Sequence, residues 1–430
     1  MQMPLVLTNR RRRGGSASAF SPTSLFATGS QGIWLDPSDL STMFSDRAGT
    51  IQVTTPGTVV GKRLDKSGRG NHAVAPTDAA RPTYGVEPKG GRRNLLTWSE
   101  DFGNAVWNTS GITYSSAAGF DGVVKNALAT VGNVGNRIRT NGNTVLPNTQ
   151  YTFSFYAKLG TATGNRYGVF DVTNATLFVA NVIYDSLLNS STYTRVSVTF
   201  TTPAGCTQIY PYLMNGTTTT GTVFLDGAQL EAGTLSAYQR VLSAYDITES
   251  GVATTHYVQY DGSDDSMSTA AIDFTGTDKM SVFAGVRKLS DAAIGMFAEL
   301  SASASSNNGA FLVAAITSPS AGWAFGSRGS IYVEANFAAT SPISSVVTGL
   351  GSAGNLATLR VNGTQVAQST LNQGTGNFGN YPLFIGRRNN ASFPFSGKDY
   401  GLIVVGKAAS AGEITDTETW LAARTAQVTL

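Results

Sequence analysis

The sequence predicts an all-β protein built from antiparallel β-sandwiches, with a single helix near its C-terminal end. Three observations carry this prediction: alternating apolar and polar residues, abundant glycine and few charges. The 430 residues include 48 glycines, and charged residues make up 13% of the chain, about half the ~25% usual in soluble domains. Glycine-rich, hydroxyl-rich connections favour tight turns between short strands. Such low charge argues against disorder, and this length predicts two or three domains.

Alternation of apolar and polar side chains is the period of a half-buried strand, and it is clearest in two segments. They are residues 151–158, "YTFSFYAK", and residues 193–200, "YTRVSVTF". Strands are also expected at residues 209–214 and 222–231. Short antiparallel strands with polar, glycine-rich connections are typical of a β-sandwich.

A second β-rich region begins near residue 256 and continues to about residue 405. Within it, Asn362 and Gly363 separate two strand-like runs, and Asn-Gly is the preferred pair for a two-residue type I′ hairpin turn. This turn predicts that Leu359 lies opposite Val366 on one face of the hairpin.

One helix is predicted after this region. Ser410 and Glu413 have the spacing of a capping box, in which each side chain bonds the backbone of the other residue. Ile414, Thr417 and Leu421 then fall on one helical face. The capping box and the shared face together predict a helix at the end of this region.

Residues 89–242 contain sequence motifs at the start, middle and end that are typical of a known type of module. These are "RRNLLTWSEDFGNAVW" at the start, "YTFSFYAK" and "YTRVSVTFTTPAG" in the middle, and "FLDGAQLEAGTLSAYQRV" at the end. With these phrases the segment resembles a jelly-roll module that is common in bacteriophage structural proteins and related in fold to carbohydrate-binding modules. The resemblance implies a jelly roll in a virion protein and does not specify a sugar.

The flanking segments carry a different set of phrases: "GIWLDPSDLSTMF", "RLDKSGRGNHAVAP" and "ARPTY" before the module, and "YVQYDGSDDSM" after it. They resemble the concanavalin A-like, or laminin-G-like, sandwiches of phage and bacterial surface proteins. In simpler relatives these phrases lie close together, whereas here about 150 residues separate Arg93 from Asp246. The closing "FSGKDYGLIVVGKAASAGEITDTETWLAAR" is similar to the last strands and terminal helix of the same fold.

We therefore expect three parts: a basic flexible anchoring arm at residues 1–30, a sandwich split between residues 31–88 and 243–430, and an inserted jelly roll at residues 89–242. A guest whose two ends lie close together can occupy a surface loop of its host without disturbing the host core. The alternative is three consecutive domains. Residues 31–88 would then form a separate domain whose small size makes it only marginally stable.

The formal net charge of +3 includes four consecutive arginines, Arg10, Arg11, Arg12 and Arg13, so the remainder of the chain is close to neutral. Such a body lacks the basic field of a nucleic-acid-binding domain, and no nucleic-acid partner is expected. The arginines form either a solvated tail or an anchor on an acidic surface of another virion protein. No apolar run reaches the ~18 residues of a membrane span, and the apolar tip precedes the charges, the reverse of a secretory signal.

Catalysis is not expected. Glycosidases on these folds need two carboxylates flanking the scissile bond, and the chain has no Glu-x-Asp-x-x-Glu stretch. The nearest cluster, Glu413, Asp416 and Glu418, falls in the predicted helix, where acidic residues in the first turn are explained by the helix dipole. Two histidines, His72 and His256, and one cysteine are too few for a histidine-rich or thiolate metal site.

Asp261, Asp264 and Asp265 form the best candidate for a bound ion, because clustered carboxylates and turn carbonyls suit calcium. The alternative is a plain turn, since one short turn supplies fewer than the six or more ligands that calcium requires. No other cofactor is expected.

Sugar recognition requires exposed aromatic faces beside hydroxyl or amide groups. Tyr156 shares a strand face with polar residues, and Tyr210 and Tyr212 point the same way along another strand. If these strands lie in one concave sheet, the three tyrosines form a sugar platform. Alternatively, they cover a sheet edge or pack on the host sandwich, because tyrosine is often half-buried.

These inferences favour a non-enzymatic bacteriophage virion structural protein, associated with the tail or a fibre, that displays carbohydrate-binding-type domains for attachment to the host surface. A capsid decoration protein or head fibre held by the same arm is the alternative, and a glycan depolymerase is a third. The expected partners are other virion proteins and host cell-surface polysaccharide. The location would be the virion, assembled in the host bacterial cytoplasm, and a homo-oligomer is expected because cyclic symmetry suits an organelle built around an axis.

Overall fold

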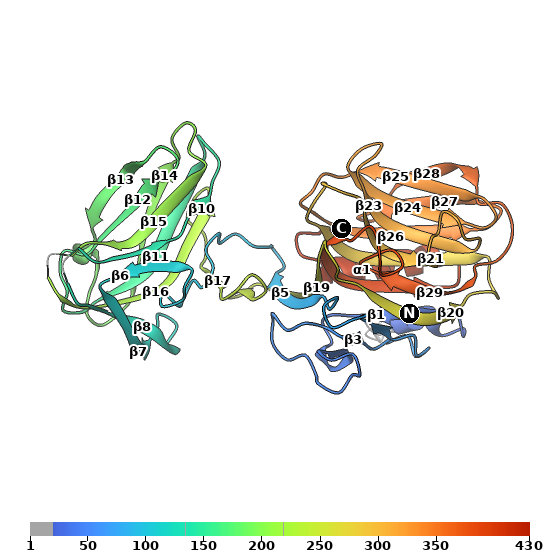
Figure 1. The fold of residues 1–430 in the computed structure, drawn as a ribbon, viewed down its shortest axis with the longest axis horizontal. Helices are drawn as coiled ribbons and strands as arrows, with labels where there is room; N and C mark the ends of the chain where they lie inside the picture. The colour runs from blue at the N-terminus through green and yellow to red at the C-terminus, as the bar shows by residue number, and fades with distance from the viewer. Residues whose placement is uncertain (1–19, 134, 218) are drawn as a thin grey trace, which may run out of the picture.

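The computed structural model describes residues 20–133, 135–217 and 219–430, and these form two lobes joined by a narrow connection (Figure 1). The described part is nearly all β, apart from four short helical segments. These are η1 (Pro22–Phe26), η2 (Leu40–Thr42), η3 (Asp185–Leu187) and α1 (Ala411–Arg424). The predicted all-β class with a short C-terminal helix is confirmed.

The larger lobe packs an eight-stranded antiparallel sheet against a nine-stranded one. The eight-stranded sheet runs in the order β28 (Thr364–Asn372), β27 (Leu356–Val361), β26 (Ile343–Ser352), β21 (Lys279–Lys288), β30 (Ser396–Val405), β19 (Thr254–Asp261) and β5 (Thr83–Pro88), with β1 (Gly32–Leu35) also paired to β30. The nine-stranded sheet runs in the order β2 (Met43–Phe44), β3 (Lys62–Arg63), β4 (Ala73–Val74), β20 (Met267–Asp273), β29 (Asn380–Ile385), β22 (Gly295–Leu300), β23 (Ala310–Ile316), β24 (Gly322–Arg328) and β25 (Tyr332–Ala338). Their facing apolar side chains form one continuous core.

The smaller lobe is a second sandwich, formed by a six-stranded and a five-stranded antiparallel sheet. The six-stranded sheet runs in the order β13 (Thr176–Ile183), β12 (Arg166–Asp171), β15 (Gln208–Asn215), β9 (Arg137–Thr140) and β6 (Trp107–Ser110), with β10 (Asn143–Thr144) also paired to β15. The five-stranded sheet runs in the order β14 (Thr194–Thr201), β11 (Gln150–Leu159), β16 (Gly221–Ala232), β8 (Val124–Val131) and β7 (Ile112–Ala118). Alternate residues of β11 and β15 point inward, so Phe153 and Phe155 meet Ile209 and Leu213 in the core.

The larger lobe draws its two sheets from both ends of the chain. β1 and β5, from the first ninety residues, pair with β30 and β19, which come after residue 250. Between β5 and β19 the chain forms the smaller lobe and the hairpin of β17 (Gln239–Val241) and β18 (Ile247–Glu249). The sandwich with an inserted jelly roll is therefore confirmed as the fold, while the limits at residues 30, 88 and 242 stay predictions.

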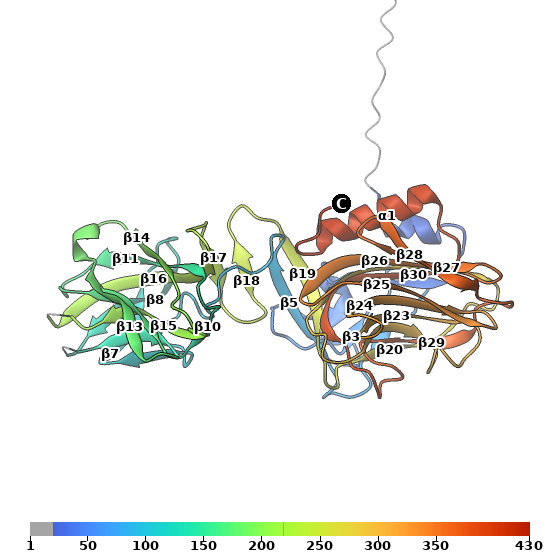
Figure 2. The same ribbon diagram turned by 90° about the horizontal axis from the view of Figure 1, so that it is seen from above.

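Helix α1 covers the outer face of the eight-stranded sheet (Figure 2). The predicted capping box is present: Glu413 N donates to Ser410 Oγ at 3.3 Å, and Ser410 N donates to Glu413 Oε2 at 2.8 Å. Leu421 is fully buried in the cluster between the helix and the sheet, and Ile414 packs against it. No helix in the described ranges combines the length and the apolar character needed to cross a bilayer.

The hairpin at Asn362 and Gly363 forms as predicted, because both residues adopt positive φ, at 48° and 80°, as a type I′ turn requires. Its register beyond the turn differs from the prediction. Leu359 pairs with Ala367 and not with Val366, since the ladder shifts by one residue between Leu359 and Arg360. A β-bulge of this kind leaves one residue of the longer strand unpaired, and the turn residues do not encode it.

Candidate functional site

A cleft of about 490 Å³ opens beside β11 in the smaller lobe. Tyr156 of β11 and Phe120, from the loop between β7 and β8, form one wall. Tyr238, Arg240 and Thr248 form the other wall, on the segment that contains β17 and β18. The cleft therefore lies where the smaller lobe's sheet meets the connection to the larger lobe.

Three aromatic rings make the apolar part of this cleft. The rings of Phe120 and Tyr156 stack with centroids 3.9 Å apart and planes within 4° of parallel. Tyr238 stands edge-on to both, at 5.3 Å from Phe120 and 5.9 Å from Tyr156. Gly227, on the neighbouring strand β16, makes this packing possible, because a Cβ at that position would come within 2.9 Å of both stacked rings.

An ionic cluster beneath the rings fixes the loop that carries Phe120. Lys125 Nζ lies 2.9 Å from a Glu100 oxygen, 3.1 Å from Asp121 and 3.2 Å from Asp226. Asp226 accepts a hydrogen bond from the backbone N–H of Phe120 at 3.0 Å. Burial raises the pKa of Asp226 to about 6, and its side chain is fully inaccessible to solvent. This carboxylate therefore supports the wall of the cleft and does not reach a ligand.

A second cleft, of about 420 Å³, lies on the other side of the stacked pair. Tyr156 and Phe120 line both clefts, and Lys158 and Tyr193 line the second one. Lys158 Nζ lies 4.1 Å from the ring centroid of Phe224 and 5.2 Å from that of Tyr193. The Phe120–Tyr156 pair is thus a ridge between two neighbouring hollows, each lined by aromatic and polar groups.

No family model matches the chain, and no curated protein matches it. The solved structures that resemble it include a carbohydrate-binding CBM40 module of a Ruminococcus gnavus IT-sialidase bound to α2,3-sialyllactose (16% identity, 32% of this chain and 81% of that chain, TM-score 0.27). They also include domains LG4-5 of the mouse laminin α1 chain (12% identity, 74% and 97%, TM-score 0.29) and a tandem CBM22 domain of Paenibacillus barcinonensis Xyn10C (10% identity, 76% and 94%, TM-score 0.23). Likeness this distant does not bear on ligand or activity.

The three tyrosines predicted to form one sugar platform lie on two different sheets. Tyr156 belongs to the five-stranded sheet, whereas Tyr210 and Tyr212 belong to β15 of the six-stranded sheet. All three point away from the shared core and are half-buried. A single platform is therefore not formed, because alternation shows which face of a strand a residue occupies but not which sheet the strand joins.

Sequence reasoning missed Phe120 and Tyr238, the two rings that complete the cleft with Tyr156. Both lie outside regular alternation, Phe120 in a loop and Tyr238 just before β17. The available signal was weak: Tyr238 lies in the closing phrase of the jelly roll, and Phe120 lies within "GFDG". The predicted anchoring residues Arg10, Arg11, Arg12 and Arg13 lie outside the described residues.

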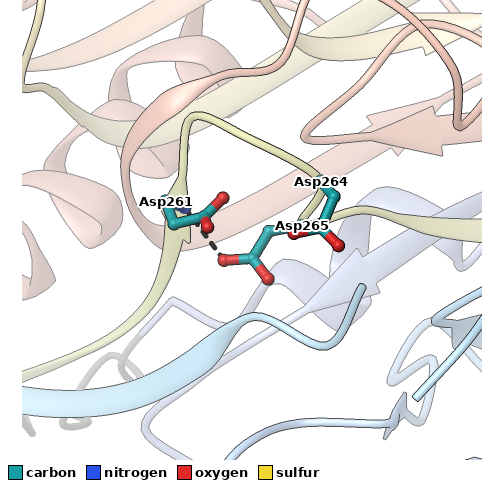
Figure 3. Close-up of side chains that lie close together, drawn as sticks. All are labelled: Asp261, Asp264 and Asp265. Atoms are coloured by element: carbon teal, nitrogen blue, oxygen red, sulfur yellow. Dashed lines mark hydrogen bonds between the residues drawn. The ribbon is translucent and has the colours of Figure 1, made fainter. Parts of the chain in front are cut away.

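Asp261, Asp264 and Asp265 do lie together, in the turn between β19 and β20 (Figure 3). Each contributes a carboxylate oxygen to a group within 4.8 Å. The turn also uses these groups internally, because Asp265 Oδ2 accepts from the backbone N–H of Asp261 at 2.9 Å and Asp261 Oδ1 accepts from that of Ser263 at 2.8 Å. Calcium binding here stays a prediction.

Asp265→Asn is expected to stabilise the protein at pH 8 and to change its stability little at pH 4. Burial, with Asp261 nearby, raises the pKa of Asp265 from 3.8 to about 7. The folded state therefore holds a proton that the unfolded state has lost, and stability falls as pH rises through this window. Asparagine removes the charge and keeps an acceptor for Asp261 N–H, so we expect a gain of about 1–2 kcal/mol at pH 8.

Urea unfolding of the native protein and the Asp265→Asn variant at both pH values measures this gain. An equal change in unfolding free energy at pH 4 and pH 8 would show that the ionisation of Asp265 does not cause the effect of the substitution.

Two of the three acidic residues of the terminal helix, Glu413 and Glu418, have structural partners. Glu413 completes the capping box, and both carboxylate oxygens of Glu418 accept from Arg360, at 2.8 and 2.9 Å. Of the histidines, His256 bonds the hydroxyl of Tyr84 at 2.8 Å, and His72 Nδ1 accepts from the backbone N–H of Asp65 at 3.0 Å. These contacts account for Glu413, Glu418 and both histidines as part of the fold.

Proposed function

We propose that the protein is a non-enzymatic glycan-binding component of a bacteriophage virion and that the cleft between Phe120, Tyr156 and Tyr238 is its sugar site. The observation that carries the proposal is the pairing of an aromatic wall with polar groups in one cleft. Aromatic rings pack against the C–H faces of sugars, while a few placed polar groups orient the hydroxyls. Asp121 and Thr248 lie in the cleft as such groups.

The placement in a virion is supported by the sequence, through the jelly-roll and concanavalin A-like phrases and the four arginines of residues 10–13. In this proposal the arm anchors the chain to another virion protein, and the two lobes project toward the polysaccharide of the host cell. A cryo-EM map of the intact particle tests the placement. Density for the chain at the tail or a fibre would support host attachment. Density on the capsid shell would instead support the role of a capsid decoration protein.

Binding of purified protein to arrayed bacterial surface polysaccharides tests the cleft. We expect Tyr156→Ala and Phe120→Ala each to weaken binding of the bound glycan about tenfold or more, because truncation of a central aromatic residue removes the packing surface. Tyr156→Phe should retain most of the affinity, since no hydrogen bond of the Tyr156 hydroxyl lies within the described part of the chain. Titration calorimetry with the best-bound polysaccharide gives these affinities.

Tyr381→Ala is the matched control, because Tyr381 is a half-buried tyrosine on β29 of the larger lobe, away from both sheets of the smaller lobe. Equal losses in Tyr156→Ala and Tyr381→Ala would contradict the cleft as the site of binding. Thermal unfolding of each variant separates loss of the site from loss of the fold.

A further inference from the structure

The outer face of the six-stranded sheet in the smaller lobe gathers arginine and aromatic side chains. Tyr210 and Tyr212 of β15 point outward there, since their neighbours Ile209 and Leu213 are in the core. By the same alternation, Phe170 of β12 points outward, because its neighbours Val169 and Asp171 are fully buried. Three arginines lie at outward positions of the flanking strands: Arg137, Arg139 and Arg166.

A ladder of stacked groups crosses three strands of this face. Phe170 and Tyr210 are cross-strand partners, and their rings lie 11° from parallel with centroids 6.1 Å apart. The guanidinium of Arg139, from β9, lies 3.9 Å from the ring centroid of Tyr210. Stacking on an aromatic ring covers a face of the guanidinium and leaves its N–H groups directed outward at the edge. One of these donates to the backbone oxygen of Thr140 at 2.8 Å.

The positive charge of this face is not neutralised within the sheet. Its six strands are described in full, and the one acidic residue they contain is Asp171, which is fully buried and accepts hydrogen bonds from Asn174. Among the described residues, no ion pair involves Arg137, Arg139 or Arg166. Guanidinium groups without a carboxylate partner are available to bind an anion in a forked, two-bond geometry.

Amide side chains complete the surface. Arg137 Nε donates to Asn108 Oδ1 at 2.9 Å, which holds the arginine along β6. Asn215 donates to Asn181 Oδ1 at 2.6 Å, which links β15 to β13 across β12. Amides both donate and accept, so they suit the hydroxyls of a sugar next to an anionic group.

We infer that this face is a second ligand site and that it binds an acidic polysaccharide, with the arginines on the anionic substituent and the tyrosines against the sugar rings. The site is separate from the Phe120–Tyr156 cleft, which lies beside the other sheet, and it goes beyond the proposed function because it selects an anionic ligand. A glycan fits better than a nucleic acid, because a nucleic-acid surface requires a broad basic field to follow a phosphate backbone. Here the charge is three arginines beside aromatic and amide groups.

Polygalacturonate, which carries a carboxylate on every sugar, tests the inference against its methyl-esterified form, which has the same backbone without the charge. We expect the native protein to bind the acid and not the ester at this face, with affinity that falls as salt is raised. Arg139→Ala and Arg137→Ala should each weaken binding about tenfold, the loss typical of a charge-assisted contact. Arg139→Lys should show an intermediate loss, because lysine keeps the charge and loses the fork.

Two controls separate this site from the cleft and from general charge effects. Phe120→Ala should bind polygalacturonate as the native protein does, so failure of the cleft and failure of this face are distinguishable. Arg387→Ala changes a half-buried arginine of the larger lobe and should have no effect. Thermal unfolding of each variant confirms that the fold is retained.

Dextran sulfate and single-stranded oligothymidylate identify the anion and the class of ligand. Binding of dextran sulfate that is lost in Arg139→Ala would support the site and extend it to sulfated sugars. Binding of polygalacturonate unaffected by either arginine variant, equal binding of the methyl ester, or equally tight binding of the oligonucleotide would overturn the inference.

Discussion

Asp399→Ala is expected to destabilise the larger lobe by about 3–5 kcal/mol, the cost of leaving a buried charge without its partner. Asp399 is inaccessible to solvent and Arg63 is 1% exposed, with Arg63 Nη1 2.5 Å from Asp399 Oδ2. Asp399 also accepts from the backbone N–H of Gly401 at 2.8 Å. Alanine removes both contacts. The guanidinium of Arg63 is then left without a partner between the two sheets, where water cannot solvate it.

Comparison of the single replacement with an apolar replacement of both residues tests this pair. Replacing both residues, as Arg63→Met with Asp399→Leu, should cost less than Asp399→Ala alone, because apolar side chains of similar size leave no buried charge. Asp246→Ala is the control, since its pair with Arg240 spans 3.5 Å and is partly exposed, and such a pair contributes less than about 1 kcal/mol. If urea unfolding gave Asp399→Ala and Asp246→Ala the same small effect, the Arg63–Asp399 pair would not stabilise the lobe.

The features predicted well from sequence are those that depend on residues close together in the chain. Alternation over residues 151–158 and 193–200 located β11 and β14, because side-chain direction in a strand repeats every two residues. The Ser410–Glu413 spacing located the start of α1 to the residue. Asn362–Gly363 located a turn.

The features not predicted depend on pairing between distant segments. Arg63 and Asp399 are 336 positions apart, and neither occurs in a pattern that marks it as buried. The cleft likewise joins Phe120, Tyr156 and Tyr238, from a loop, a strand and a connection between strands. No local period relates such positions, because their contact follows from the order of strands in the sheets. For the same reason, the sequence did not show that Tyr156 and Tyr210 lie on different sheets, although both lie on regular strands.

Lys89→Met is expected to destabilise the larger lobe by about 2–4 kcal/mol through the end of α1. A hydrogen bond from a charged donor contributes about 1.5–3 kcal/mol, and two of the three carbonyls that Lys89 binds keep a backbone donor. Lys89 follows β5, at the point where the chain leaves the larger lobe. Its Nζ donates to the backbone oxygens of Ala422, Thr425 and Val428, at 2.6, 2.5 and 2.5 Å. These carbonyls belong to the last turn of the helix and to the segment after it. Two of them also accept a longer backbone hydrogen bond, Ala422 O from Thr425 N at 3.3 Å and Thr425 O from Val428 N at 3.4 Å. A cation at this end also complements the helix dipole.

Methionine keeps most of the apolar stem of lysine and removes the ammonium group, so the measured loss reports the three hydrogen bonds. Lys407→Met is the matched control, because Lys407 pairs with Glu413 at the opposite end of α1, where a partly exposed pair contributes less than about 1 kcal/mol. Urea unfolding gives the two costs, and hydrogen exchange should show faster exchange in the last turn of α1 in Lys89→Met alone. Equal costs for the two variants would mean that Lys89 adds no more than a surface charge. A larger cost for Lys89→Met would mean that one residue joins β5 to the terminal helix, two elements more than 300 positions apart, at the point where the smaller lobe begins.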